Sequence, residues 1–162
     1  MGVELTYNSL STLTRELTPS VFESVLIALD NSPLDQRIMA VAQGLNFAPG
    51  AKIVFTHVLP YPEDAAEQDV SRPLPVEHDL PQVQIEQYLS AWARQLSQIA
   101  PVIEVVQGNA DVEIVRLANI HQVSLIILGS RGLTGVDRIL AGSVSSQVVE
   151  EAPCTVMVVK PG

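Results

Sequence analysis

One stretch of the sequence, residues 129–145, concentrates glycines, hydroxyl side chains and arginines. Gly129 and Gly132 carry no Cβ, so the backbone there can turn tightly and approach a ligand closely. Gly142 stands immediately before Ser143, where a new helix is predicted to begin. Unpaired backbone N–H groups and the helix dipole favour an anion at such a position. We call residues 129–145 the glycine-rich segment, and its residue types suit the binding of phosphate.

Side chains of the glycine-rich segment add donors and charge to this backbone. The hydroxyls of Ser143 and Ser145 can donate to phosphate oxygens, and Arg131 and Arg138 carry positive charge. A purely structural reading fits the spacing equally well, because Ser143 can cap its helix and glycines after strands mark tight turns. Neither G-x-G-x-x-G nor G-x-x-x-x-G-K-[ST] occurs in the segment, which contains no lysine.

The formal net charge of −9 restricts the partners of this chain. Non-specific binding of DNA or RNA depends on Lys and Arg neutralising phosphates, so we expect no nucleic-acid partner. We expect no membrane partner either, because no apolar run reaches the roughly 18–20 residues of a spanning helix. Cys154 is the only cysteine, which excludes an intrachain disulfide and a cysteine-based metal site. Residues 1–20 show no secretory signal, and these features together predict a cytoplasmic protein.

Apolar runs and helix signals alternate along the chain and must position the glycine-rich segment. The apolar runs predict strands at 21–28, 52–58, 102–106, 124–128 and 155–159. Helices are predicted at 33–46, from near residue 81 to a stop at Pro101, from Gly108-Asn109 onward, and at 143–151. This order predicts an open α/β fold, with a parallel sheet covered by helices on both faces. Residues 60–81 read as an exposed acidic loop, and residues 1–20 as an arm before a single domain at 21–162.

A second loop with suitable chemistry follows the first predicted strand. It is Asp30-Asn31-Ser32, where Ser32 can cap the next helix and Pro33 suits its first turn. Ligands of open parallel sheets bind outside the carboxyl ends of the strands, at the point where the strand order reverses. We therefore expect this loop and the glycine-rich segment to lie beside one ligand.

The spacing of Gly129, Gly132 and Gly142-Ser143 resembles the G-x2-G-x9-G-[ST] nucleotide motif of the universal stress protein family. The resemblance extends over residues 125–160, returns at 25–32, and covers the chain from about residue 22 to its end. It implies the ATP-binding branch of the family, a Rossmann-like fold of the adenine-nucleotide-binding type with five strands in the order 3-2-1-4-5, and a homodimer. Ser124 and Thr155 depart from common family residues at positions that concern packing or the dimer edge.

The resemblance also implies a role for individual residues. Asp30 would lie near the ribose or the adenine, and the backbone of Val58 would meet the adenine edge. The remaining nucleotide-binding residues would be Ala28, Leu29, Leu128, Gly129, Arg131, Gly132, Gly142, Ser143, Val144 and Ser145. The ligand would be ATP or another adenine nucleotide, ADP or AMP, with Mg²⁺ as a companion ion. The last strand, 155–159, would lie at a sheet edge and pair with the same strand of a second subunit.

Several residues that suggest chemistry at first sight are better explained by structure. We interpret His57 and His121 as structural, Trp92 as a core residue and Cys154 as a small buried hydrophobic residue. Asp137 can reach a phosphate-bound Mg²⁺ or pair with a neighbouring arginine, and we favour the pair.

The residue set favours nucleotide binding over nucleotide hydrolysis. Efficient phosphoryl transfer needs a positioned nucleophile, metal ligands and charge stabilisers. The glycine-rich segment offers charge stabilisers but no convincing base, and Asp30 is better suited to accept from a ribose. The sequence therefore predicts a nucleotide-dependent regulator in stress response or signalling. The alternatives are a slow ATP-hydrolysing enzyme, and a dimeric interaction module that works through loop 60–81 without a nucleotide.

Overall fold

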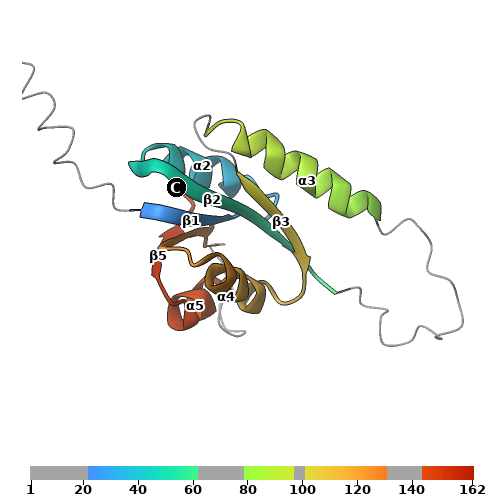
Figure 1. The fold of residues 1–162 in the computed structure, drawn as a ribbon. Helices are drawn as coiled ribbons and strands as arrows, with labels where there is room; N and C mark the ends of the chain where they lie inside the picture. Colours follow the sequence, from blue (N-terminus) through green and yellow to red (C-terminus); the bar gives the residue numbers. More distant parts are fainter. Residues whose placement is uncertain (1–21, 62–78, 97–100, 131–143) are drawn as a thin grey trace, which may run out of the picture.

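A parallel sheet forms the centre of the protein in the computed structural model, which describes residues 22–61, 79–96, 101–130 and 144–162 (Figure 1). The sheet has five strands in the order β3-β2-β1-β4-β5, and every neighbouring pair is parallel. Its strands are β1 (Phe22–Ala28), β2 (Phe47–Leu59), β3 (Val102–Gln107), β4 (Leu125–Gly129) and β5 (Thr155–Val159). The predicted fold class and strand order are confirmed.

Four described helices cover the two faces of the sheet (Figure 1). The helices α2 (Leu34–Gln43) and α3 (Asp79–Ala93) lie on one face. The helices α4 (Ala110–His121) and α5 (Val144–Glu151) lie on the other. None of the helices in the described ranges is both long and apolar enough to cross a membrane.

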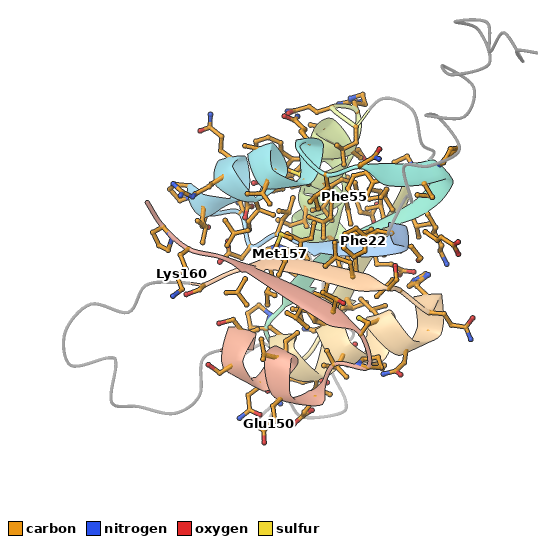
Figure 2. All side chains as sticks on the ribbon, turned by 90° about the vertical axis from the view of Figure 1, so that its left-hand side faces the viewer. Phe22, Phe55, Glu150, Met157 and Lys160 are labelled. Atoms are coloured by element: carbon orange, nitrogen blue, oxygen red, sulfur yellow. The ribbon has the colours of Figure 1, made fainter. Side chains whose placement is uncertain are left out.

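Alternate residues of the central strands point into two separate cores. Val25 and Ile27 of β1 join Phe55 in the core beneath α2 and α3. Leu26, between them, joins Val54 in the core beneath α4 and α5. All of these side chains are fully buried, because strands covered on both faces have no solvated side. In Figure 2, Phe55 lies on the side of the sheet covered by α2 and α3, and Glu150 points away from the sheet.

The structure corrects three of the predicted element bounds. Strand β2 begins at Phe47, five residues before the predicted start at residue 52, and runs through Pro49 and Gly50. The register with β1 shifts between Phe47 and Lys52, and Gly50 has φ +77° there, so the dipeptide makes an irregularity inside the strand. Helix α2 ends at Gln43, before Gly44, and α3 ends at Ala93, well before the predicted stop.

The strand order reverses at β1, which pairs with β2 on one side and with β4 on the other. At the opposite end of this pair, the backbone N–H and the hydroxyl of Ser124 both donate to the carbonyl oxygen of Ser24, at 2.8 and 2.9 Å. Thr155 pairs with Leu125 at the start of β5, which is an edge strand of the described sheet. The pairing of β5 with a second subunit stays a prediction.

Candidate functional site

A cavity of about 540 Å³ opens at the carboxyl ends of β1, β2 and β4. Its volume lies within the range of about 300–1,000 Å³ that is typical of small-molecule sites. The first turns of α4 and α5 line it on one face of the sheet, and the start of α2 lines it on the other. Its lining residues are Ala28, Leu29, Asp30, Leu34, Ile38, Thr56, His57, Val58, Pro60, Ala110, Ile114, Leu128, Gly129, Val144 and Ser145.

Every predicted site residue within the described ranges lines this one cavity. These residues are Ala28, Leu29, Asp30, Val58, Leu128, Gly129, Val144 and Ser145. They come from three strand ends and one helix start that are far apart in the sequence. The other predicted residues, Arg131, Gly132, Gly142 and Ser143, lie outside the described residues, as do Asp137 and Arg138.

The walls of the cavity are mostly apolar, because the strand residues that line it continue the cores below. Ala28 pairs in register with Thr56, and the N–H of Leu29 donates to the carbonyl oxygen of Thr56 at 3.0 Å. Val58 and Leu128 extend the same wall toward the α4 and α5 side. A flat, apolar ring system fits walls of this kind, while polar groups at the rim set its orientation.

Packing against α2 gives Gly129 a role in addition to the predicted one. A Cβ at this position would lie 2.6 Å from Cδ2 of Leu34 and 3.2 Å from Cδ1 of Ile38. Both side chains belong to α2. The missing side chain therefore allows α2 to pack closely on the end of β4. Gly129 also lines the cavity, and the approach of a ligand to it stays a prediction.

The turn after β1 is held by the carboxylate of Asp35. Oδ1 accepts from the backbone N–H of Asp30 at 3.3 Å, and Oδ2 accepts from that of Asn31 at 2.9 Å. Asn31 has φ +60°, in the left-handed region that asparagine tolerates better than most residues. Pro33, not the predicted Ser32, is the N-cap residue of α2, although the hydroxyl oxygen of Ser32 accepts from the N–H of Leu34 at 3.3 Å. These contacts give the turn one defined shape beneath Asp30.

His57 holds the other side of the same turn. Its Nδ1 lies 2.8 Å from the carbonyl oxygen of Leu29. Because a carbonyl oxygen only accepts, Nδ1 carries the proton and donates it. The structural interpretation of His57 is confirmed by this bond, but the ring also lines the cavity, which the sequence reading missed.

Tyr88 of α3 is the third donor to Asp35. Its hydroxyl donates to Oδ2 at 2.7 Å, so α3 is tied to the turn across a separation of 53 residues. Burial raises the pKa of Asp35 above its ordinary 3.8, and the nearby charge of Asp30 raises it further, while the bond from Tyr88 lowers it. Burial and the bond to Asp35 raise the pKa of Tyr88 to about 12, which keeps its hydroxyl a donor at neutral pH.

Two helix N-termini reach the cavity with different charges in their first turns. Asp111 and Glu113 stand in the first turn of α4. The first turn of α5, which includes Val144 and Ser145, has no acidic residue. Carboxylates neutralise the positive end of a helix dipole. An anion is therefore favoured at the start of α5 over the start of α4.

Thr56 is a buried polar residue in the wall of the cavity. The residue is fully buried, and its hydroxyl has no hydrogen-bond partner among the described residues. Because this hydroxyl has no surface exposed to the cavity, the fit to a nucleobase rests on the apolar walls formed by Ala28, Val58 and Leu128. Among the described residues, no group of three or more His, Cys, Asp or Glu side chains is arranged to hold a metal ion.

The sequence reading missed Asp35, Tyr88 and Thr56 as parts of the site. Asp35 stands three residues after the predicted cap Ser32, which is the spacing of a capping box, and this signal was available. Tyr88 shares a helix with core residues and carried no signal. Of the residues interpreted as structural, His121 bonds Glu104 at 2.9 Å and Trp92 packs on the core beneath α3. The partly buried Cys154 packs on the α4 and α5 core, where burial raises the pKa of its thiol.

Comparisons with known proteins agree on one family. The model of the universal stress protein family matches residues 22–160. The universal stress protein in the QAH/OAS sulfhydrylase 3′ region of Thermus aquaticus is 29% identical over 144 residues, which cover 86% of this chain and 100% of that protein.

Solved structures of similar fold include hypothetical protein MJ0577 and two universal stress proteins with a bound nucleotide. Hypothetical protein MJ0577 has a TM-score of 0.68 and 23% identity, over 88% of this chain and 98% of that one. A universal stress protein in complex with cAMP has a TM-score of 0.63 and 21% identity, over 86% and 98% of the two chains. A universal stress protein from Archaeoglobus fulgidus in complex with dAMP has a TM-score of 0.54 and 14% identity, over 85% and 98%.

Proposed function

The chain belongs to the universal stress protein family, and on that premise we propose that its cavity binds an adenine nucleotide and that the protein is a nucleotide-dependent regulator. We assign it to the branch of the family that binds ATP. The observation that carries this proposal is the meeting of eight predicted nucleotide-binding residues around a single cavity. Similar structures that contain cAMP and dAMP support the same class of ligand.

The adenine and the ribose belong at the strand ends in this proposal. The base lies between the apolar walls of Ala28, Val58 and Leu128. The ribose hydroxyls donate to the carboxylate of Asp30, which stands exposed at the end of β1. A carboxylate accepts from hydroxyls but repels phosphates, so Asp30 favours the sugar over the phosphate chain.

The phosphates belong at the start of α5 in this proposal. The first turn of that helix lacks acidic residues, and the positive end of a helix dipole favours anions. Five residues of the glycine-rich segment would complete the phosphate site: Arg131, Gly132, Gly142, Ser143 and Ser145. Mg²⁺ would accompany the phosphates of ATP.

Regulation is favoured over catalysis by the groups that border the described part of the cavity. The acidic residue that lines this part of the cavity is Asp30, which we assign to the ribose. Nδ1 of His57 is already bonded to the carbonyl oxygen of Leu29. We infer that the bound nucleotide changes the contacts of the protein in the cytoplasm, with β5 (Thr155–Val159) joining two copies. Light scattering after gel filtration that shows only monomers would refute this dimer.

The decisive experiment identifies the ligand directly. Protein purified without added nucleotide is denatured, and the released small molecules are analysed by mass spectrometry. Titration calorimetry then compares ATP, ADP and AMP, with and without Mg²⁺, against GTP as the control. We expect an adenine nucleotide to be released or bound and GTP to bind weakly. If no adenine nucleotide is released and none binds, the proposal is wrong and the interaction module is favoured.

Three substitutions separate binding from hydrolysis and test the phosphate end. Phosphate release that persists after Asp30→Ala and Asp137→Ala would identify a contaminating ATPase, whereas loss of release would favour the slow enzyme. Gly132→Val places a side chain in the proposed path of the phosphates. An unchanged ATP affinity in this variant would refute the placement.

A further inference from the structure

The shape of the turn that presents Asp30 depends on contacts from outside that turn. Asp35 lies on α2 and is fully buried, although it is an acidic residue. Acidic side chains are rarely buried unless their oxygens are paired. Here the pairing comes from the N–H groups of Asp30 and Asn31 and from the hydroxyl of Tyr88. The buried carboxylate thus connects the turn after β1 with α3.

We propose that Asp35 and Tyr88 are positioning residues for ribose recognition: together they hold the Asp30-Asn31 turn so that the carboxylate of Asp30 faces the sugar. This inference rests on the proposed function. It adds two residues that lie outside the set expected to touch the nucleotide, and one of them belongs to a helix that does not line the cavity.

The geometry explains why a local cap would not be enough. Asn31 is in the left-handed region with φ +60°, a conformation that needs support from its surroundings. The bond from its N–H to Oδ2 of Asp35, at 2.9 Å, supplies that support. The same Oδ2 accepts from Tyr88 at 2.7 Å. The hydroxyl of Tyr88 therefore controls the orientation of the oxygen that fixes Asn31.

Packing makes Tyr88 a rigid donor. Its ring packs against the core beneath α3 and meets Trp92 edge to face, with 6.2 Å between the ring centroids. On the other side of the turn, His57 holds the carbonyl oxygen of Leu29 at 2.8 Å. The backbone that carries Asp30 is thus bonded to β2 and, through Asp35, to α3. A movement of α3 would change the direction of Asp30 before it changed the apolar walls.

The test measures how well the protein distinguishes ATP from 2′,3′-dideoxy-ATP, which lacks both ribose hydroxyls. Calorimetry gives the ratio of the two dissociation constants for the wild type, Tyr88→Phe and Asp35→Asn. We expect the wild type to prefer ATP, and each variant to reduce that preference by about threefold to tenfold, a range typical of coupling between neighbouring residues. The affinity for dideoxy-ATP should stay unchanged, because a lost orientation of Asp30 has no effect on a ligand without hydroxyls.

Two controls separate positioning from general damage. Trp92→Phe alters the packing of Tyr88 on α3 but leaves its hydroxyl in place, so it should lower stability and keep the preference for ATP. The double variant Asp30→Ala with Tyr88→Phe should bind ATP no more weakly than Asp30→Ala alone, because Tyr88 acts through Asp30. If Asp35→Asn fails to fold, Tyr88→Phe carries the test by itself, since Phe keeps the ring.

The outcomes distinguish this inference from the proposed function. If the wild type prefers ATP and Asp30→Ala abolishes the preference, but Tyr88→Phe retains it in full, the positioning role is wrong and nucleotide binding stands. Equal loss of affinity for both nucleotides in Tyr88→Phe would show structural damage and would overturn the inference too. If the wild type binds neither nucleotide, both proposals fail.

Discussion

The two ends of the cavity differ in charge, although both are built from strand ends and helix starts. At one end, Asp30 lines the cavity, and the fully buried Asp35 of α2 places a second carboxylate behind it. At the other end, the first turn of α5 carries Val144 and Ser145 and no acidic residue. The two ends of the cavity therefore favour ligand groups of different charge. Hydrogen-bond donors of a ligand are favoured at the acidic end, and its anionic groups at the α5 end.

Removal of the Asp30 carboxylate should have the largest effect on nucleotide affinity and tests which part of the ligand lies at the acidic end. Asp30→Ala should weaken ATP binding by about tenfold to a hundredfold, the effect of losing hydrogen bonds to a charged acceptor. Adenosine should be weakened by the same factor, because it has the same ribose. Calorimetry with both ligands measures the two factors, and Asp30→Asn is the control that keeps an acceptor. A loss confined to ATP would show that the acidic end faces the phosphates, opposite to our assignment.

A carboxylate introduced at the α5 end should make the two ends alike. Val144→Asp adds an acid to the first turn of α5, where Val144 is 42% exposed. We expect ATP binding to weaken about tenfold through repulsion of the phosphates, and adenosine binding to stay the same. The free energy of unfolding should rise by about 0.3–1 kcal/mol, because the acid complements the helix dipole.

Two further variants serve as controls for Val144→Asp. Val144→Asn has nearly the same shape as the aspartate but no charge, so ATP affinity should stay close to that of the wild type. Asp111→Asn removes an acid from α4 and should change ATP affinity little. If Asp111→Asn instead strengthens ATP binding more than Val144→Asp weakens it, the phosphates lie at α4.

The buried carboxylate predicts a pH dependence of stability at the acidic end. Because the pKa of Asp35 is raised above 3.8 in the folded protein, chiefly by burial, the folded state holds its proton more tightly than the unfolded state. The contribution of Asp35 to stability is therefore full below pH 3.8 and is lost as the pH rises through the raised pKa. Urea unfolding of the wild type and Asp35→Asn, repeated between pH 4 and 7, measures this. The wild type should lose stability relative to the variant as the pH rises, and a constant difference would contradict the prediction.

The smallest effect concerns Thr56, whose hydroxyl has no partner among the described residues. Thr56→Val should change the free energy of unfolding by less than about 1 kcal/mol, because no hydrogen bond within the described part of the protein is lost. Ser24→Ala is the matched control, since the Ser24 hydroxyl is also buried without a partner among the described residues but does not line the cavity. Neither variant should weaken nucleotide binding, because the Thr56 hydroxyl has no surface exposed to the cavity. Weaker binding by Thr56→Val alone would show that the nucleobase reaches this hydroxyl after all.

The order of elements and the main site loops could be predicted from the sequence because they depend on local signals. Apolar runs longer than a turn specify strands, and the spacing of Gly129 and Gly132 after such a run marks a ligand loop. The element bounds were less certain. Pro49-Gly50 looks like a chain break but lies inside β2, because the register shift beside β1 accommodates both residues. The packing role of Gly129 could not be predicted either, since its neighbour Leu34 lies on α2, far away in the sequence.

The sequence by itself determined that this chain forms a parallel α/β sheet and that Asp30 and residues near Ser145 meet at its switch point. Hydrophobic periodicity and turn residues are local features of the sequence, and the parallel topology then brings the strand ends together. Only the tertiary structure decided how Asp30 is held. The bond between Asp35 and Tyr88 joins residues 53 positions apart, and no local pattern records a contact whose strength comes from burial in a shared core.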